Sequence, residues 1–205
     1  MGTQEAHGSV IERHPLIEEI LDAHRDRARG DEAGYAGYRG HVYRVFNYAR
    51  HLVPDAGDDR DDKLAIAAAF HDLEAFKSLD YLAPSIRTQD LWLEQTGRAQ
   101  WAPELAVIIA QHHRFTPYRG SHARLTEVFR VADLADVSQG LIHPGIPSDF
   151  MKAVRRTHDV GPFFTRLVPQ AMLRHVVRHP LDPMPHVRAR RGLTQAGHAG
   201  ADRRL

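Results

Sequence analysis

The apolar residues of this chain recur at spacings of three and four residues along almost its whole length. Such spacing places them on one face of an α-helix, whereas a half-buried strand would alternate apolar and polar residues. No segment of useful length alternates in that way, and the sequence has no internal repeat. The periodicity therefore predicts an all-α protein, a single bundle of about seven to eight helices.

Proline and glycine mark several boundaries of the predicted helices. Gly30 and Pro54 each follow the last turn of an apolar stripe, and Pro103 stands at a first-turn position, where its missing N–H costs nothing. The predicted helices span residues 10–29, 38–53, 61–77, 84–94, 103–113, 122–138, 147–158 and 163–179.

Composition and charge are typical of a soluble globular domain. Hydrophobic residues make up 42% and charged residues 26% of the chain, and the formal net charge is +1. A net charge this small gives no broad field for binding nucleic acid. The N-terminus lacks the apolar core of a signal peptide, and no run approaches the ~18 apolar residues of a membrane span. We therefore expect a cytoplasmic protein with no membrane and no specific nucleic-acid partner.

The domain boundaries follow from changes in composition. We expect residues 1–8 to be a mobile N-terminus and residues 9–180 to form the helical domain. After Pro180, proline, glycine and arginine replace most large apolar residues, which predicts a flexible basic tail over 181–205. The tail lacks the aromatic residues that stack on bases, so a solvated end is favoured over a nucleic-acid contact.

Three predicted helices carry imidazole or carboxylate groups on their apolar faces. His41 begins one apolar stripe, the pair His71–Asp72 follows the buried run LAIAAAF, and Asp133 lies on a third stripe. A buried carboxylate is costly unless a cation or hydrogen bonds compensate it. The chain has no cysteine, which excludes thiolate metal sites and thiol nucleophiles, but it has 15 histidines. Mixed nitrogen and oxygen donors predict a divalent transition metal.

The order His41, His71–Asp72 and Asp133 on successive helices resembles the HD-domain superfamily of metal-dependent phosphohydrolases. The likeness covers about residues 38–140, through the segments YRGHVYRVFNYA, LAIAAAFHDLEAF and FRVADLADVS. It implies that these four residues bind one ion of Fe, Mn, Co, Ni or Zn. It also implies hydrolysis of a small phosphoester, with nucleotides among the candidates, by metal-activated water whose proton Asp72 accepts. Asp136 is the alternative to Asp133, and we assign it a supporting or capping role.

Other polar residues near these motifs are candidates for catalysis or substrate binding. The resemblance implies that Glu74 orients the attacking water, although it stands one residue nearer to the HD pair than in one-metal nucleotidases. His112 continues the apolar stripe of its helix and is a candidate catalytic residue. The candidates for binding substrate phosphate, each of which is also explained as a surface residue, are Lys77, His113, Arg114 and Arg119.

The number of ions and the reaction class leave alternatives open. Two-metal members of the superfamily have extra histidines between the HD pair and the final aspartate. Here that interval contains His112, His113 and His122 but no earlier histidine, so we expect one ion per chain. The alternatives are a di-iron oxygenase or small-molecule hydratase, and a non-catalytic, metal-stabilised module that senses a ligand or binds a partner. A homodimer is compatible with the sequence.

Overall fold

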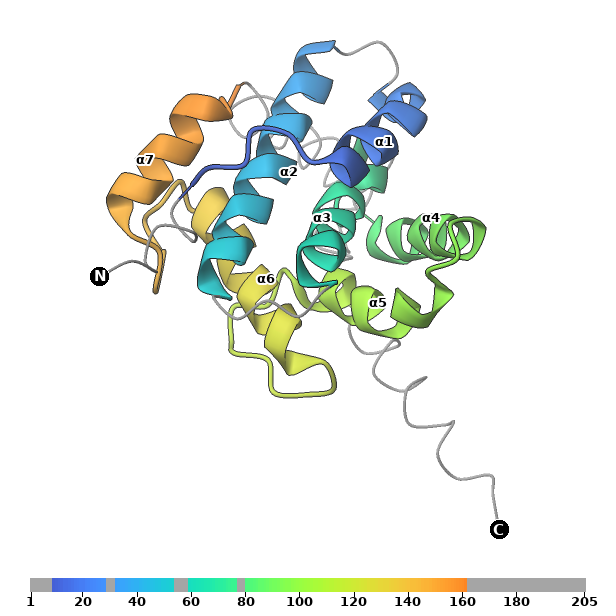
Figure 1. Ribbon diagram of the computed structural model, residues 1–205. Coiled ribbons are helices and arrows are strands. Elements are labelled where there is room, and N and C mark those ends of the chain that lie inside the picture. Colours follow the sequence, from blue (N-terminus) through green and yellow to red (C-terminus); the bar gives the residue numbers. More distant parts are fainter. Residues whose placement is uncertain (1–8, 29–31, 54–58, 77–79, 162–205) are drawn as a thin grey trace, which may run out of the picture.

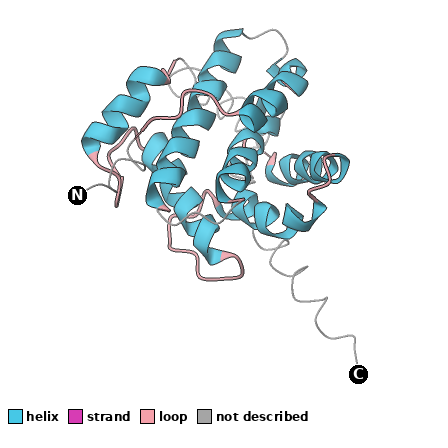
Figure 2. Cartoon of the chain, viewed as in Figure 1, coloured by secondary structure: helices cyan, strands magenta, loops and turns pink. Residues whose placement is uncertain are grey.

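The computed structural model describes residues 9–28, 32–53, 59–76 and 80–161. Within these ranges the chain is helical and contains no strand, which confirms the predicted all-α fold (Figure 2). The residues 1–8, the predicted helix 163–179 and the basic tail 181–205 lie outside this part. The α-helices are α1 (Pro15–Ala23), α2 (Glu32–Leu52), α3 (Arg60–Phe70), α4 (Leu82–Gln95), α5 (Ala102–Gln111), α6 (Ala123–Val137) and α7 (Ser148–Thr157), and the 3-10 turns are η1 (Arg25–Ala28), η2 (Leu73–Phe76) and η3 (Ala99–Trp101).

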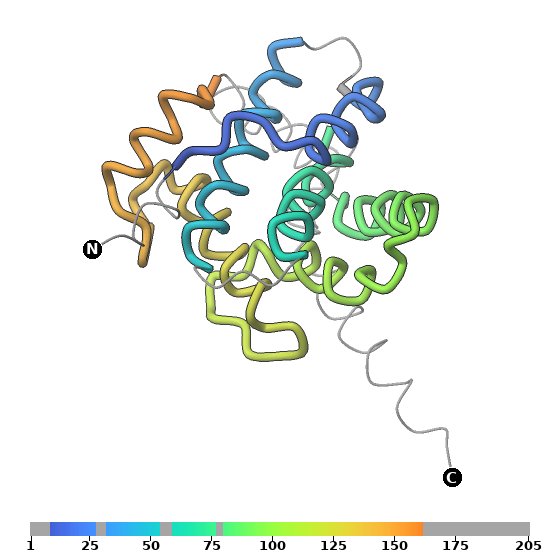
Figure 3. Tube along the Cα trace, viewed as in Figure 1, coloured from blue at the N-terminus to red at the C-terminus, as the bar shows by residue number. Residues whose placement is uncertain are grey.

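Helix α2 lies between its neighbours at the centre of the bundle. It packs against α6 and α3, and α3 also packs against α1 and α5 (Figures 1 and 3). Helices α4 and α5 lie on one side of this centre and α7 lies on the other (Figure 1). No described helix is both long and apolar enough to cross a membrane. The expected cytoplasmic location stays a prediction.

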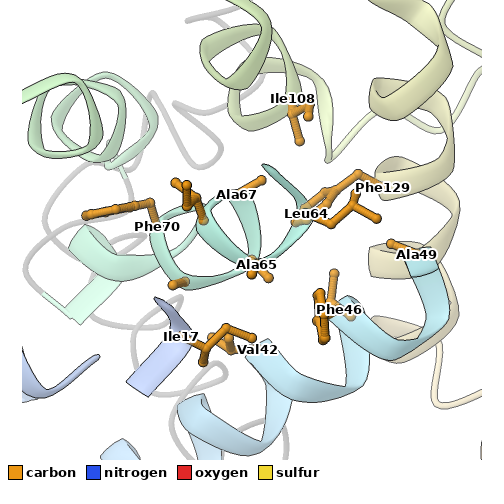
Figure 4. Close-up of a cluster of buried hydrophobic side chains, with 14 of the residues drawn as sticks. Ile17, Val42, Phe46, Ala49, Leu64, Ala65, Ala67, Phe70, Ile108 and Phe129 are labelled. Carbon is orange, nitrogen blue, oxygen red and sulfur yellow. The ribbon is translucent and has the colours of Figure 1, made fainter. Parts of the chain in front are cut away.

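After its charged first turn, helix α3 is buried on every side, as an apolar, alanine-rich helical segment must be. Residues 64–70 are fully buried. Small alanine side chains let the neighbouring helices approach, and larger side chains from those helices fill the remaining space (Figure 4). The labelled core residues are Ile17, Val42, Phe46, Ala49, Leu64, Ala65, Ala67, Phe70, Ile108 and Phe129.

Helix α1 begins at Pro15 rather than at the expected residue 10. Proline disfavours helical geometry in the residue before it, and His14 is extended, with φ −127° and ψ 128°. Asn47 on α2 holds the extended segment in place. The backbone N–H of Ile11 donates to Asn47 Oδ1 at 2.8 Å, and Asn47 Nδ2 donates to the Ile11 carbonyl at 3.1 Å.

Helix α3 ends at Phe70, although the apolar pattern predicted a helix over 61–77. The last carbonyls of a helix lack partners within it. Here the Ala68 carbonyl accepts a hydrogen bond from His71 Nδ1 at 2.8 Å, and the Ala69 carbonyl accepts one from the Tyr38 hydroxyl at 2.8 Å. Side chains thus satisfy two of the last carbonyls of the helix, and the chain continues into the turn η2.

Gly40 lies where α2 meets the segment after α7. A Cβ at this position would lie 2.3 Å from the carbonyl oxygen of Asp159 and 2.9 Å from Arg44 Nη1. The backbone would have to move to make room. We therefore expect Gly40→Ala to lower the free energy of unfolding by about 1–3 kcal/mol, measured by chemical denaturation, despite the better helix propensity of alanine. Ala36→Ser, at an exposed position of the same helix, is the control; equal stability of the two variants would contradict this packing.

Candidate metal centre

Four helices bring the candidate side chains to one place in the interior. His41 lies on α2, the pair His71–Asp72 directly follows α3, His112 directly follows α5, and Asp133 lies on α6. Their exposed fractions are 0% for His41 and His71, 1% for His112, 2% for Asp133 and 9% for Asp72. The structure therefore places all four predicted metal ligands, and His112, in the interior of the bundle.

The four predicted ligands surround a common point. The Nε2 atoms of His41 and His71 are 2.9 Å apart. Asp72 Oδ2 lies 3.7 Å from the first of these nitrogens and 3.6 Å from the second. Asp133 Oδ1 lies 3.6 and 3.9 Å from them. Donors that share one ion at about 2.0–2.2 Å lie no more than ~4.4 Å apart, so the distances of each carboxylate to the two nitrogens fit a single ion. The donor atoms that all lie within 4.8 Å of one another are those of His41, His71 and Asp72.

Hydrogen bonds at Nδ1 fix the orientation and the tautomer of three histidines. In each, Nδ1 faces an oxygen that only accepts: His41 faces Asp136 Oδ2 at 2.8 Å, His71 faces the Ala68 carbonyl at 2.8 Å, and His112 faces the Ile109 carbonyl at 2.7 Å. Each Nδ1 therefore donates a proton to its partner, and a ring that carries this proton alone presents an Nε2 lone pair. Two such lone pairs would repel each other where His41 meets His71. A cation between them would turn this repulsion into coordination.

Buried polar atoms at the same point have no hydrogen-bond partner. They are Asp72 Oδ1, Asp133 Oδ1 and His112 Nε2. An unsatisfied buried acceptor costs the desolvation free energy of the group, about 1–3 kcal/mol and more when it is charged. Because one divalent cation would satisfy these atoms together, the donor set fits a metal ion.

The pKa values in this cluster reflect burial and close charges. Burial raises the pKa of Asp133 to about 6 and lowers the pKa of His71 to about 3. Burial alone would raise the pKa of Asp72, but the His71 and His112 side chains hold it well below its usual range. Burial also opposes protonation of His112, yet the Asp72 side chain, 3.3 Å away, and the charge of Asp133 raise its pKa. Without a metal ion, protons on Asp133 and His112 are the alternative source of positive charge.

Protons and metal therefore compete for the cluster, which predicts pH-dependent binding. A carboxylate must lose its proton to bind an ion, and the pKa of Asp133 is raised to about 6. We expect the affinity for Mn²⁺, measured by calorimetric titration, to be nearly constant above about pH 7 and to fall by up to ~10-fold per pH unit below about pH 6. The same affinity at pH 5 and pH 7 would contradict this role of Asp133.

Asp136 supports the cluster from behind His41. Its Oδ2 accepts the His41 bond and also a bond from Arg44 Nη2 at 2.9 Å, while its Oδ1 accepts from Arg44 Nε at 2.7 Å. Burial would raise the pKa of Asp136, but His41 and Arg44 hold it below its usual value. Arg44 Nη1 donates to the carbonyls of His158 and Asp159 at 3.2 and 2.6 Å. Partners of this kind orient a ligating histidine and raise its basicity.

A second donor group shares Asp72 with the first. The side chains of Asp72, His112 and His113 offer atoms that lie within 4.8 Å of one another, as do those of His41, His71 and Asp72. His112 Nε2 lies 3.3 Å from Asp72 Oδ1. The side chains of His113 and Asp72 are 26% and 12% exposed, so the cluster faces solvent on this side.

Tyr81, just before α4, is a member of the cluster that the sequence analysis did not identify. Its hydroxyl hydrogen-bonds to His113 Nε2 and lies near the Asp72 side chain. Burial, together with the charges of Asp72 and Asp133, raises the pKa of Tyr81 well above its usual value. A tyrosine at the start of a helix is an ordinary core residue in sequence, so no local signal marked it.

Glu74 lies in the turn η2, and its carboxylate contacts residues outside the donor cluster. Its buried carboxylate is 3.3 Å from Arg27 Nη1 and accepts a hydrogen bond from Thr88 Oγ1 at 3.0 Å. Burial, together with the charges of Asp72 and Glu74, raises the pKa of Tyr38 well above its usual value. The proposed orientation of water by Glu74 stays a prediction.

The cationic candidates lie on the solvent side or beyond the described residues. Arg114 is half-buried and donates to Gln111 Oε1 at 3.4 Å and to Thr116 Oγ1 at 3.2 Å. Arg119 is exposed on the loop between α5 and α6. Lys77 lies outside the residues that the structure describes. Their predicted contacts with substrate phosphate stay predictions.

Comparison with protein-family models, with curated proteins and with solved structures finds no match to this chain. The observation that bears on chemistry is the donor set itself. It combines imidazole nitrogens and carboxylate oxygens from separate helices, without a thiolate, as His41, His71, His112, Asp72 and Asp133. Borderline transition metals prefer such ligands.

Proposed function

We propose that this protein is a metal-dependent phosphohydrolase of the HD-domain type that acts on a small phosphoester, with nucleotides among the candidate substrates. The observation that carries the proposal is the approach of two lone-pair nitrogens, His41 Nε2 and His71 Nε2, to 2.9 Å inside the bundle beside two carboxylates. We propose that His41, His71, Asp72 and Asp133 hold one divalent ion of Mn, Fe, Co, Ni or Zn.

The side chains around this point have distinct proposed roles. A bound divalent ion supplies a water of lowered pKa and shields negative charge on a phosphoryl group. Asp72 Oδ1 has no hydrogen-bond partner and is placed to accept the proton of the attacking water. His112 Nε2, 3.3 Å from that oxygen, offers the proton a second acceptor. Phe129 packs edge-on against the His71 ring at 5.4 Å and excludes water from the inner side.

The substrate side is proposed at the exposed edge of the cluster. His113 is the most exposed histidine of the donor groups, with 26% of its side chain accessible. The next residue, Arg114, begins a loop that also carries Arg119. Guanidinium groups suit phosphate because they offer planar pairs of donors. We propose that His113, Arg114, Arg119 and Lys77 form the phosphate-binding side.

A second function is favoured by one specific observation. The group formed by Asp72, His112 and His113 shares Asp72 with the first donor group. Two ions bridged by one carboxylate are the arrangement that a di-iron oxygenase or a two-metal hydratase requires. This second candidate therefore depends on a second ion being bound in the native protein.

Metal analysis and a substrate screen together test these functions. The protein is purified without added metal, its ions are counted by mass spectrometry, and phosphate release is measured over nucleotides and small phosphoesters with Mn²⁺, Co²⁺ and Zn²⁺. We expect one ion per chain and phosphate release that His41→Ala abolishes and that His122→Asn, at an exposed position, leaves intact. Two irons with dioxygen consumption and no phosphate release would favour the oxygenase. A chain that binds no divalent ion would refute both.

A further inference from the structure

We propose that the Tyr81 hydroxyl limits this chain to one bound ion by occupying the donor group of Asp72, His112 and His113. The inference rests on the proposed metal centre and adds the residue that decides its stoichiometry. Two ions in the site would suit one class of reaction and a single ion another, so Tyr81 would select between them.

The first step is the position of the hydroxyl. Tyr81 is 5% exposed, and its ring lies perpendicular to the His113 ring, with centroids 6.1 Å apart. The hydroxyl hydrogen-bonds to His113 Nε2 and lies near the Asp72 side chain. It therefore binds one member of the second donor group and adjoins another.

The second step is the direction of the hydrogen bond to His113. A phenol carries one proton at neutral pH, and its oxygen also accepts. Because an ionised carboxylate accepts and does not donate, the neighbouring Asp72 favours an O–H that points toward it, and the oxygen then accepts from His113 Nε2–H. This arrangement engages the Nε2 atom of His113. A second ion could bind His113 through this nitrogen only after breaking the bond that the hydroxyl makes.

The third step is the contrast with the first donor group. Between His41 Nε2 and His71 Nε2, 2.9 Å apart, there is no room for a hydroxyl, and the described residues place none there. A cation would compensate those lone pairs. In the second group a neutral oxygen already satisfies His113 Nε2, so the gain from binding a second ion is smaller.

Tyr81→Phe tests the proposal because phenylalanine keeps the ring and its packing and removes only the oxygen. We expect one ion per chain in the wild type and two in Tyr81→Phe, counted by mass spectrometry after equilibration with Mn²⁺ or Zn²⁺. Calorimetric titration should show second-ion affinity higher by roughly 10- to 100-fold, the equivalent of one hydrogen bond to a charged group. Tyr35→Phe, at a half-buried tyrosine that packs under Arg25, is the matched control and should bind one ion.

A double variant locates the additional ion. Tyr81→Phe combined with His112→Ala should return to one ion per chain, because His112 belongs only to the second donor group. If Tyr81→Phe lowers the melting temperature by more than ~5 °C, Tyr81→Leu provides a second oxygen-free side chain for the same measurement.

The outcomes separate this inference from the proposed function. One ion in both wild type and Tyr81→Phe overturns the role of Tyr81 and leaves the phosphohydrolase proposal intact. Two ions in the wild type also overturn it. One ion in the wild type and two in Tyr81→Phe, with no phosphate release from either, supports the inference and refutes the phosphohydrolase. A wild type that binds no ion refutes the metal centre itself.

Discussion

Asp72→Asn is expected to abolish metal binding and the proposed phosphate release. Asp72 approaches the Nε2 atoms of His41, His71 and His112 to 3.7, 3.6 and 3.3 Å, and among the described residues it is the carboxylate common to both donor groups. Asparagine keeps the shape of the side chain but removes its charge and its ability to accept a proton. We expect the affinity for Mn²⁺ to fall by more than ~100-fold, since changing residues that merely support ligands already costs about 10–100-fold.

Turnover should fall further than metal affinity. Loss of a general base costs about 10²–10⁴-fold, and saturating metal would not restore it. Phosphate release at high Mn²⁺ measures this part separately from binding. Asp61→Asn, at a carboxylate whose side chain is 37% exposed beside Arg50, is the control and should leave both properties unchanged. An Asp72→Asn protein that keeps a stoichiometric ion and full turnover would refute the proposed site.

Asp136→Ala is expected to lower the free energy of unfolding by about 3–5 kcal/mol, the cost of leaving one partner of a buried ion pair alone. Both Arg44 and Asp136 are fully buried. The variant removes the carboxylate that pairs with the Arg44 guanidinium and keeps the backbone carbonyls that accept from Arg44 Nη1. Chemical denaturation of the metal-free protein measures this effect without contributions from bound ions.

Two further variants test the cause of this destabilisation. The double variant Asp136→Ala with Arg44→Met removes both charges, and we expect it to regain part of the lost stability. Asp61→Ala breaks the half-exposed pair with Arg50 and should cost less than ~1 kcal/mol. Stability of Asp136→Ala within 1 kcal/mol of the wild type would contradict the role of this pair.

The affinity of Asp136→Ala for metal should also fall by about 10–100-fold, because His41 loses the acceptor that orients it.

The helical fold was predictable because burial and periodicity coincide along the chain. The early end of α3 was not, because the side chains that satisfy its last carbonyls are those of His71 and of Tyr38 on another helix. The late start of α1 has a similar cause, since Asn47 holds the preceding segment extended. Contacts between distant residues decided both boundaries, and a local pattern does not contain them.

The candidate ligands were identified because polar residues on apolar faces are unusual. The same reasoning could not find Tyr81, whose ring is ordinary core material and whose hydroxyl matters only through its neighbours. It could not pair Arg44 with Asp136 either, because these residues are 92 positions apart. For Glu74 the sequence suggested a site role, whereas the turn after α3 brings its carboxylate to Arg27 and Thr88.

The last described turn of the chain closes back on its beginning. His158 Nε2 donates to the Ile11 carbonyl at 2.9 Å, and the His158 ring stacks on Tyr43 at 4.6 Å. Arg44 reaches the carbonyls of the same turn. A fragment trimmed to the motif-bearing helices would lose these contacts. Arg44, which holds the Asp136 partner of His41, would then lose the backbone carbonyls that accept its hydrogen bonds. The smallest autonomous version of this metal centre must therefore include both the segment before α1 and the turn after α7.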